Sequence, residues 1–218
     1  MKRVMLAVAL APWVATPAAA QWAGMPVWNN PKGGTGVTIS GDFASNNDDA
    51  GGGSAFGARG TAGIGTLSLT AGLASWKPDG FDERTLSYGA TAGFRVIGGS
   101  LLPVSLNLQL GAGSAGEITA GTTTVPKTTM ITAGAGISAS VPTPGLSIEP
   151  YVSLTNRWHK QSGVSGTESN IGYTIGASMA FGMLGLHFAY DSEKRDGRGT
   201  SGIFGIGAHV ALKAPIGM

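Results

Sequence analysis

The feature that most constrains the fold is a strict alternation of apolar and small residues, which is clearest over residues 184–213. Alternate positions in its first half are apolar: Leu184, Leu186, Phe188 and Tyr190. The positions between them are small or polar: Gly185, His187, Ala189 and Asp191. Successive side chains of a strand point to opposite faces, so a period of two predicts strands. The charged, glycine-rich stretch 192–199 predicts the loop of a hairpin.

The same alternation recurs along the chain and predicts ten strands. They are expected near residues 36–46, 54–65, 66–76, 84–97, 102–115, 128–141, 146–159, 169–182, 184–192 and 201–213. Their connections fall into two kinds. One kind is short and low in charge, whereas the other is polar and mostly longer, at 46–53, 77–83, 116–127, 160–168 and 192–199. An antiparallel meander whose two ends face different compartments would have this asymmetry.

The two ends of the chain are expected to lie outside this sheet. Residues 1–20 have the pattern of a secretory signal, with Lys2 and Arg3 at the start and cleavage near Ala20. A retained membrane anchor is the alternative, but the apolar stretch is shorter than the roughly 20 residues that span a bilayer. Residues 21–34 form a lead-in without periodicity, residues 35–213 the strand region, and residues 214–218 a short tail.

Composition excludes several functions. The chain has no cysteine, which excludes disulfides and thiolate metal sites. Without Lys2 and Arg3 the 14 basic residues become 12, which balance the 12 acidic ones, so a nucleic-acid partner is not expected. No phosphate-binding loop and no zinc-ligand spacing occurs, so no cofactor and no metal are expected.

Two all-β architectures fit the alternation, a soluble sandwich and a membrane barrel. The small-residue face carries almost no lysine, although soluble sheets place charge on their exposed faces. Aromatic residues also gather near the polar-loop ends of the strands, as at a membrane–water interface. They are Phe43, Phe56, Trp76, Tyr88, Trp158, Tyr173, Tyr190 and Phe204. We therefore predict an antiparallel up-and-down transmembrane β-barrel, with ten strands or, as the alternative, eight.

This combination of signal peptide, alternating strands, short turns, long polar loops and aromatic girdles resembles the small bacterial outer-membrane β-barrels of the opacity and outer-membrane-protein-A types. The resemblance implies a place in the bacterial outer membrane, with outer-membrane lipid and the outer-membrane assembly machinery as partners and five polar extracellular loops. The last strand resembles the assembly signal of such barrels. The chain departs from the family by continuing to Met218, whereas the family usually stops on an aromatic residue.

The alternation also predicts which charged side chains point inward. They are Asp42, Arg59, Arg95, Glu149, Arg157, His159, His187, Asp191 and His209. Asp42 and Arg59 lie on adjacent predicted strands at similar height, so an ion pair is expected, and Arg95 could meet Glu149 across the lumen. Inward charges of small barrels usually pair and hold the walls together, because an unpaired buried charge is expensive.

Three functions remain open at this stage. The first is a structural or surface-interaction barrel, and the second is a narrow passive channel, because most inward residues are small. A hydrolase is the least favoured, since His159, Asp191, Ser162, Ser192 and Asp196 gather near the loop ends without any catalytic motif. We predict no catalytic residues and expect His159 to face water. Residues 21–32, with Trp22 and Trp28, could plug the lumen or anchor the chain at the membrane interface.

Overall fold

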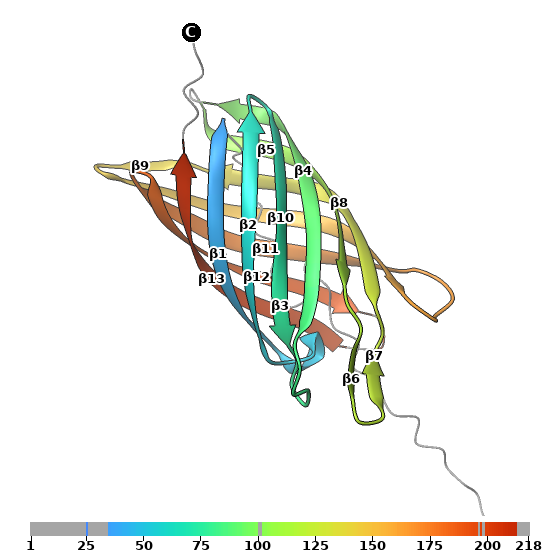
Figure 1. Cartoon of the computed structure of the whole chain (residues 1–218). Helices are drawn as coiled ribbons and strands as arrows, with labels where there is room; N and C mark the ends of the chain where they lie inside the picture. Colours follow the sequence, from blue (N-terminus) through green and yellow to red (C-terminus); the bar gives the residue numbers. More distant parts are fainter. Residues whose placement is uncertain (1–24, 26–34, 100–101, 196, 198, 213–218) are drawn as a thin grey trace, which may run out of the picture.

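The computed structural model describes residues 25, 35–99, 102–195, 197 and 199–212, and it forms one closed antiparallel β-barrel (Figure 1). Ten long strands make the wall in the order of the chain, and the last of them pairs with the first. Register runs continuously along this closing seam, from Val37 opposite Leu212 to Asn46 opposite Ile203. The predicted ten-stranded barrel is confirmed, and its wall is closed because β1 pairs with β13.

The strands of the wall agree closely with the predicted ranges. They are β1 (Gly36–Asn46), β2 (Ser54–Ile64), β3 (Leu67–Lys77), β4 (Thr85–Gly99), β5 (Leu102–Ala115), β8 (Thr128–Ala139), β10 (Leu146–Gln161), β11 (Glu168–Phe181), β12 (Leu184–Arg195) and β13 (Gly199–Leu212). The remaining elements lie in the connections: the 3₁₀ turn η1 (Asp48–Ala50), the strands β6 (Ile118–Ala120) and β7 (Thr123–Val125), and β9 (Val141–Thr143).

The two ends of the barrel differ as predicted. At one end the strands meet in short turns, such as the two-residue turn between Ile64 and Leu67, where Gly65 has a φ of 62°. The first strand begins and the last strand ends at this same turn end. At the other end the connections are longer, and β6 pairs with β7 in a hairpin that projects beyond the wall (Figure 1).

The outer wall is apolar over its whole circumference. Large hydrophobic side chains on it are strongly exposed, for example Ile39 at 60%, Leu110 at 59% and Ile175 at 56%. A soluble protein rarely exposes a continuous apolar surface of this size. The wall is therefore suited to hydrocarbon, in which every backbone donor and acceptor must be satisfied by its neighbouring strand.

The inner face carries the small and polar residues, and its burial changes along the barrel axis. Toward the loop end the inward side chains are buried, among them Ser87, Thr132 and Thr174. Toward the turn end the inward positions are half-buried, as at Thr61, Arg95 and Glu149. The inward side chains are thus mostly more buried at the loop end than at the turn end.

One predicted boundary is wrong. The stretch 192–199 was expected to be a loop, but β12 continues to Arg195 and pairs there with Gly199. Ser192 and Glu193 are strand residues and are buried, at 2% and 1%. The alternation that marks the strand continues from the inward Asp191 through Glu193 and Arg195. The charge of Glu193 and Arg195 suggested a solvated loop, although both belong to the inner face.

Residues 1–20 and 214–218, with the expected signal peptide and tail, lie outside the described residues, as does the lead-in except for Met25. Within the described part of the chain, no helix is long and apolar enough to cross a membrane.

Candidate functional site

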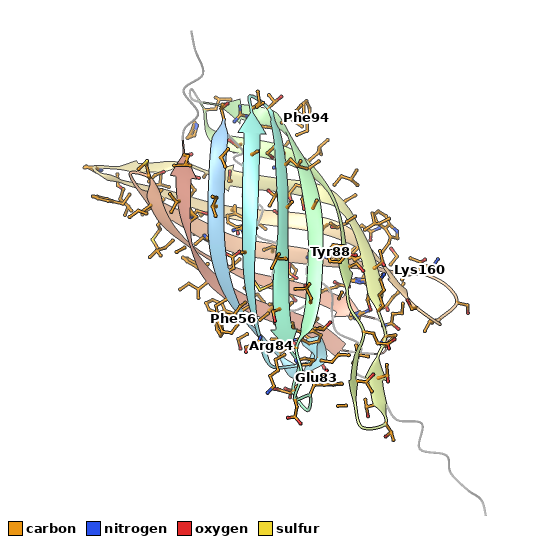
Figure 2. The ribbon with its side chains drawn as sticks, in the orientation of Figure 1. Phe56, Glu83, Arg84, Tyr88, Phe94 and Lys160 are labelled. Atoms are coloured by element: carbon orange, nitrogen blue, oxygen red, sulfur yellow. The ribbon has the colours of Figure 1, made fainter. Side chains whose placement is uncertain are left out.

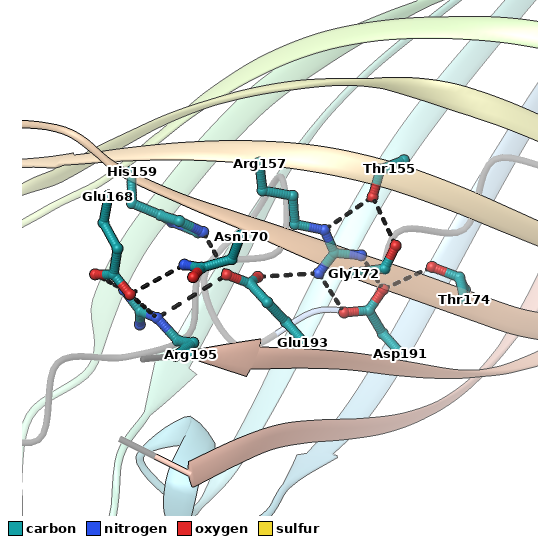
Figure 3. A network of polar contacts seen from close by, with 10 residues as sticks. All are labelled: Thr155, Arg157, His159, Glu168, Asn170, Gly172, Thr174, Asp191, Glu193 and Arg195. Carbon is teal, nitrogen blue, oxygen red and sulfur yellow. Dashed lines mark hydrogen bonds and ion pairs between the residues drawn. The ribbon is translucent and has the colours of Figure 1, made fainter. Parts of the chain in front are cut away.

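The polar residues inside the barrel form two clusters at different heights. The rim network lies near the loop end and comprises Arg157, His159, Glu168, Asp191, Glu193 and Arg195 (Figure 3). The waist cluster lies closer to the turn end and comprises Asp42, Arg59, His187 and His209. The alternation of the strands positions both clusters, because each member occupies an inward position of its strand.

Arg157 is the centre of the rim network. It lies on β10 and reaches across β11 to β12, where it donates two hydrogen bonds of 2.7 Å to the carboxylate of Asp191. The same guanidinium donates a third bond of 3.2 Å to Glu193 and a fourth of 3.0 Å to Thr155. Two carboxylates therefore share one planar cation whose donors match their geometry.

The path of Arg157 across the neighbouring strand depends on Gly172. A Cβ atom on this residue would lie 2.3 Å from the Cζ atom of Arg157, closer than any real contact. Glycine on β11 thus leaves the space through which the guanidinium passes to reach β12 (Figure 3). Thr174 on the same strand donates a hydrogen bond of 2.6 Å to Asp191 and completes the shell of that carboxylate.

The remaining charged residues of the rim network are paired with one another. His159 Nε2 lies 2.7 Å from Glu193, and Arg195 donates to the carboxylate of Glu168 over 2.9 and 3.1 Å. The expectation that His159 faces water is wrong, because only 2% of the residue is exposed. Three acids, two arginines and a histidine are brought together, so the charges balance within about one unit.

The waist cluster contains the predicted ion pair. Arg59 donates to Asp42 over 2.9 Å, and the other oxygen of Asp42 lies 2.6 Å from His187 Nε2. The Nδ1 atoms of His187 and His209 are 3.1 Å apart, so one ring donates the proton that the other accepts. These contacts join β1, β2, β12 and β13, and the cluster therefore ties the closing seam together.

Arg95 and Glu149 lie at the turn end, as predicted. Arg95 donates a hydrogen bond of 3.0 Å to the carbonyl of Gly65, and Glu149 accepts one of 3.2 Å from Ser147. Both side chains are half-buried. Their described contacts hold the turn end of β4 and β10 to adjacent backbone and side chains.

Apolar residues form a second buried group inside the barrel. This cluster contains Met25, Ala44, Ala50, Ala55, Ala74, Trp76, Ala115, Ala189 and Ile203. Met25 is 2% exposed, and its Cε atom would lie 3.2 Å from a Cβ atom on Gly57, an inward position of β2. A residue that precedes the first strand by eleven positions therefore lies inside the barrel.

The first loop folds over this apolar cluster. Ala50 of η1 is 1% exposed, and the indole of Trp76 donates a hydrogen bond of 3.1 Å to the carbonyl of Gly52. Asn47 accepts a hydrogen bond of 2.9 Å from the backbone of Gly202 and so ties the loop to β13. The first loop is thus held over the apolar cluster by Trp76 and Gly202.

Most of the predicted aromatic girdle lies on the outer wall. Its exposed members are Phe43, Phe56, Tyr88, Tyr173, Tyr190 and Phe204, and Trp158 is half-buried. Phe43 and Phe56 form a tilted pair with ring centroids 5.2 Å apart. Placing Trp76 in the girdle is wrong, because it occupies an inward position of β3 and is 1% exposed. The sequence already indicated this direction. Leu67, Leu69 and Leu73 point outward at odd positions of β3, so the alternation turns the even position 76 inward.

Sequence reasoning missed four inward residues that the structure brings into the interior: Glu168, Glu193, Arg195 and Tyr151. The three charged ones were assigned to loops. Tyr151 is 5% exposed on the inner face of β10, and its ring lies where a Cβ atom on Gly176 would be. The alternation of β10, which places Arg157 inward, gives the same direction for every odd residue, including Tyr151.

The structure describes four of the five residues that were considered for a hydrolase. His159 contacts Glu193, while Ser162 lies in the loop after β10 and Asp196 lies outside the described residues. Within the described part of the chain, neither Ser162 nor Ser192 is a hydrogen-bond partner of His159. Among the described residues, no group of three or more potential ligands is placed to hold a metal ion.

Comparison with solved structures identifies the fold. The beta domain of the Bordetella autotransporter BrkA superposes with a TM-score of 0.54 at 12% identity, covering 82% of this chain and 100% of that domain. Neisserial surface protein A covers 81% of this chain and 96% of its own at a TM-score of 0.35 and 16% identity. Ail, the attachment invasion locus protein of Yersinia pestis, superposes with a TM-score of 0.29 at 13% identity. The match covers 82% of this chain and 100% of Ail.

No protein-family model matches the sequence, and no curated protein matches it either. At 12% identity the likeness to the BrkA beta domain concerns the fold alone. The ten-stranded closure, the apolar outer wall and this likeness together give the chain the fold of an outer-membrane β-barrel.

Proposed function

We propose that the protein is an integral barrel of the bacterial outer membrane with a structural or surface-interaction role, and that its lumen is closed on the extracellular side. The observation that carries the proposal is the desolvated ion pair of Arg157 with Asp191 and Glu193. Their side chains are 1%, 3% and 1% exposed. Buried charges with this many mutual hydrogen bonds fix the walls against each other and leave little room for permeating water.

The apolar cluster supports the same conclusion from the other half of the cross-section. Trp76 and Ile203 are each 1% exposed beside Met25, and η1 covers them from the loop end. An open channel would instead line its path with hydrated polar groups. Catalytic activity is not part of the proposal, since His159 is buried against a carboxylate.

The projecting hairpin of β6 and β7 is the part of the barrel best placed for contact with other molecules. Its base is anchored by Ile118 and Val125, each 4% exposed, while Thr119 and Thr124 are exposed and lie hydroxyl to hydroxyl at 3.1 Å. A rigid stem with exposed hydroxyls suits polar contact with surface molecules. In the proposed orientation this hairpin and the other loops face outside.

A narrow passive channel is the second candidate, favoured by the half-buried inward residues at the turn end. Conductance of the refolded protein in planar bilayers decides between the two. The closed barrel predicts no steady conductance, once insertion is verified by resistance of the barrel to unfolding on a cold denaturing gel. Steady single-channel steps from the inserted parent protein would favour the channel and contradict the closed lumen.

A further inference from the structure

We infer that the outer wall at the loop end of β2, β3 and β4 binds the phosphate of an outer-leaflet glycolipid through Arg84. The inference rests on the proposed membrane location. The site lies on the lipid-facing side at Phe56, Ser75 and Leu86, which lie opposite one another in register. It lies on the opposite side of the wall from both polar clusters.

Ser75 is the smallest of the three residues. Its neighbours Phe56 and Leu86 are 53% and 56% exposed on the outer wall. Arg84 immediately precedes β4, and its side chain lies over Ser75 and Phe56. Its Nη1 atom donates to the carbonyl of Ser75 over 3.0 Å, and its Cζ atom lies 5.2 Å from the centre of the Phe56 ring.

These contacts hold the guanidinium of Arg84 in place but use only one of its three nitrogen atoms as a hydrogen-bond donor toward residues that the structure describes. A cation over an aromatic face gains electrostatic energy, and the ring also limits the orientations of the side chain. Within the described chain, the only hydrogen bonds of Arg84 come from Nη1, to Ser75 and to the carbonyl of Ser54 over 3.5 Å. Nε and Nη2 therefore remain as a pair of donors with the spacing that bidentate phosphate recognition uses.

The surroundings favour a lipid over a soluble phosphate. From Arg84 toward the turn end, β4 continues into the exposed Leu86 and Tyr88. Tyr88 lies above Arg84 in Figure 2, so acyl chains can pack against β4 while the headgroup meets the guanidinium. Lys77 is also exposed and lies two positions beyond Ser75 on the same strand, where it adds a second positive charge. Glu83 lies further toward the loop end in Figure 2, on the side of Arg84 away from Phe56.

Arg84→Gln tests the inference against Lys160→Gln as a matched control. Lys160 is another exposed cation at the loop end of an outward strand face, but it is not among the cations held over an aromatic ring in the described structure. Each refolded protein is mixed in detergent with diphosphorylated lipid A, and retained lipid is counted by native mass spectrometry. Arg84→Gln should lower the occupancy about tenfold, because hydrogen bonds between charged groups are lost. Lys160→Gln should leave it within about twofold.

Further binding experiments test which chemical group of the lipid is recognised. Dephosphorylated lipid A should bind the parent about as weakly as the phosphorylated lipid binds Arg84→Gln, and excess inorganic phosphate should not displace the bound lipid. Phe56→Leu should also lower occupancy, because it keeps an apolar wall but removes the ring under the guanidinium. Unchanged occupancy in Arg84→Gln, an equal loss in Lys160→Gln, or displacement by inorganic phosphate would overturn the inference.

Failure of the proposed membrane location can be distinguished from failure of the lipid site. If the parent does not insert into bilayers at all, the membrane location itself is wrong. If all variants insert and unfold alike while Arg84→Gln keeps its lipid, only the lipid site is wrong.

Discussion

The guanidinium of Arg157 on β10 meets the carboxylate of Asp191 on β12 through two parallel hydrogen bonds of 2.7 Å, although β11 lies between their strands (Figure 3). Gly172 on β11 has no side chain to obstruct this contact. Three consecutive strands are therefore linked at one height near the loop end. The closed lumen that we propose depends on this contact more than on any other.

Removing the cation should be strongly destabilising. Arg157→Met leaves Asp191 and Glu193 buried without their partner, and we expect a loss of about 3–5 kcal/mol of unfolding free energy. Urea unfolding in lipid vesicles measures it, with the exposed Lys160→Met as the control, which should stay within about 0.5 kcal/mol. Similar values for the two variants would contradict the importance of the buried pair.

Gly172→Ala should also destabilise the barrel, because its Cβ atom would lie 2.3 Å from Arg157 Cζ and displace the guanidinium. We expect about 1–3 kcal/mol in the same unfolding experiment. Gly60→Ala is the control, since a Cβ atom there meets nothing within 4 Å. If both alanines have the same effect, the passage across β11 is not needed.

The fold could be predicted from the sequence because hydrocarbon allows few alternatives. The outward positions of β5, such as Leu106, Leu108 and Leu110, alternate with Asn107 and Gln109, and this pattern fixes the two faces without knowledge of the neighbours. An even number of strands with two kinds of connection then gives an up-and-down barrel. Strand ends were less certain, because the charge of Glu193 and Arg195 fits a loop as well as a polar lumen.

The contact partners of the inward side chains were harder to predict than the face to which each side chain points. Asp42 and Arg59 are on adjacent strands, and similar height was enough to expect their ion pair. Arg157 and Asp191 are separated by a strand, so their contact depends on Gly172 and on side-chain reach, which alternation does not describe. His159 was misjudged because its partner Glu193 had been assigned to a loop.

Arginine on the outer wall should be costly in a bilayer. Leu108 is 52% exposed in the middle of β5, and Leu108→Arg should lose about 2–4 kcal/mol of unfolding free energy in vesicles. Leu108→Met, which keeps an apolar side chain of similar volume, should lose under about 1.5 kcal/mol. An arginine tolerated as well as methionine would mean that this face does not contact lipid.

Met25 offers a direct test of what fills the lumen, because the chain has no cysteine of its own. Cysteines at Met25 and Gly57 should be bridged by a short bifunctional thiol reagent in the folded protein, since the two positions are in contact. The pair at Met25 and Ala71, an exposed outward position of β3, should stay unbridged. Equal bridging of both pairs, or none of either, would place Met25 outside the lumen.

Deletion of residues 21–32 tests whether the contact between Met25 and Gly57 helps to close the barrel. If the lead-in helps to close the barrel, the deletion variant should conduct in planar bilayers while keeping the β-sheet spectrum of the parent by circular dichroism. If the lead-in serves only as an interfacial anchor, conductance should not change.

Labelling of single cysteines on intact bacterial cells tests the membrane location and orientation most directly. Thr119→Cys lies in the hairpin of β6 and β7, and Thr66→Cys lies in the short turn between β2 and β3. With a large membrane-impermeant maleimide, position 119 should be labelled on intact cells and position 66 only after the outer membrane is permeabilised. Labelling of position 66 but not 119 on intact cells would reverse the orientation, and labelling of neither on intact cells but both after permeabilisation would contradict an outer-membrane barrel that displays its loops.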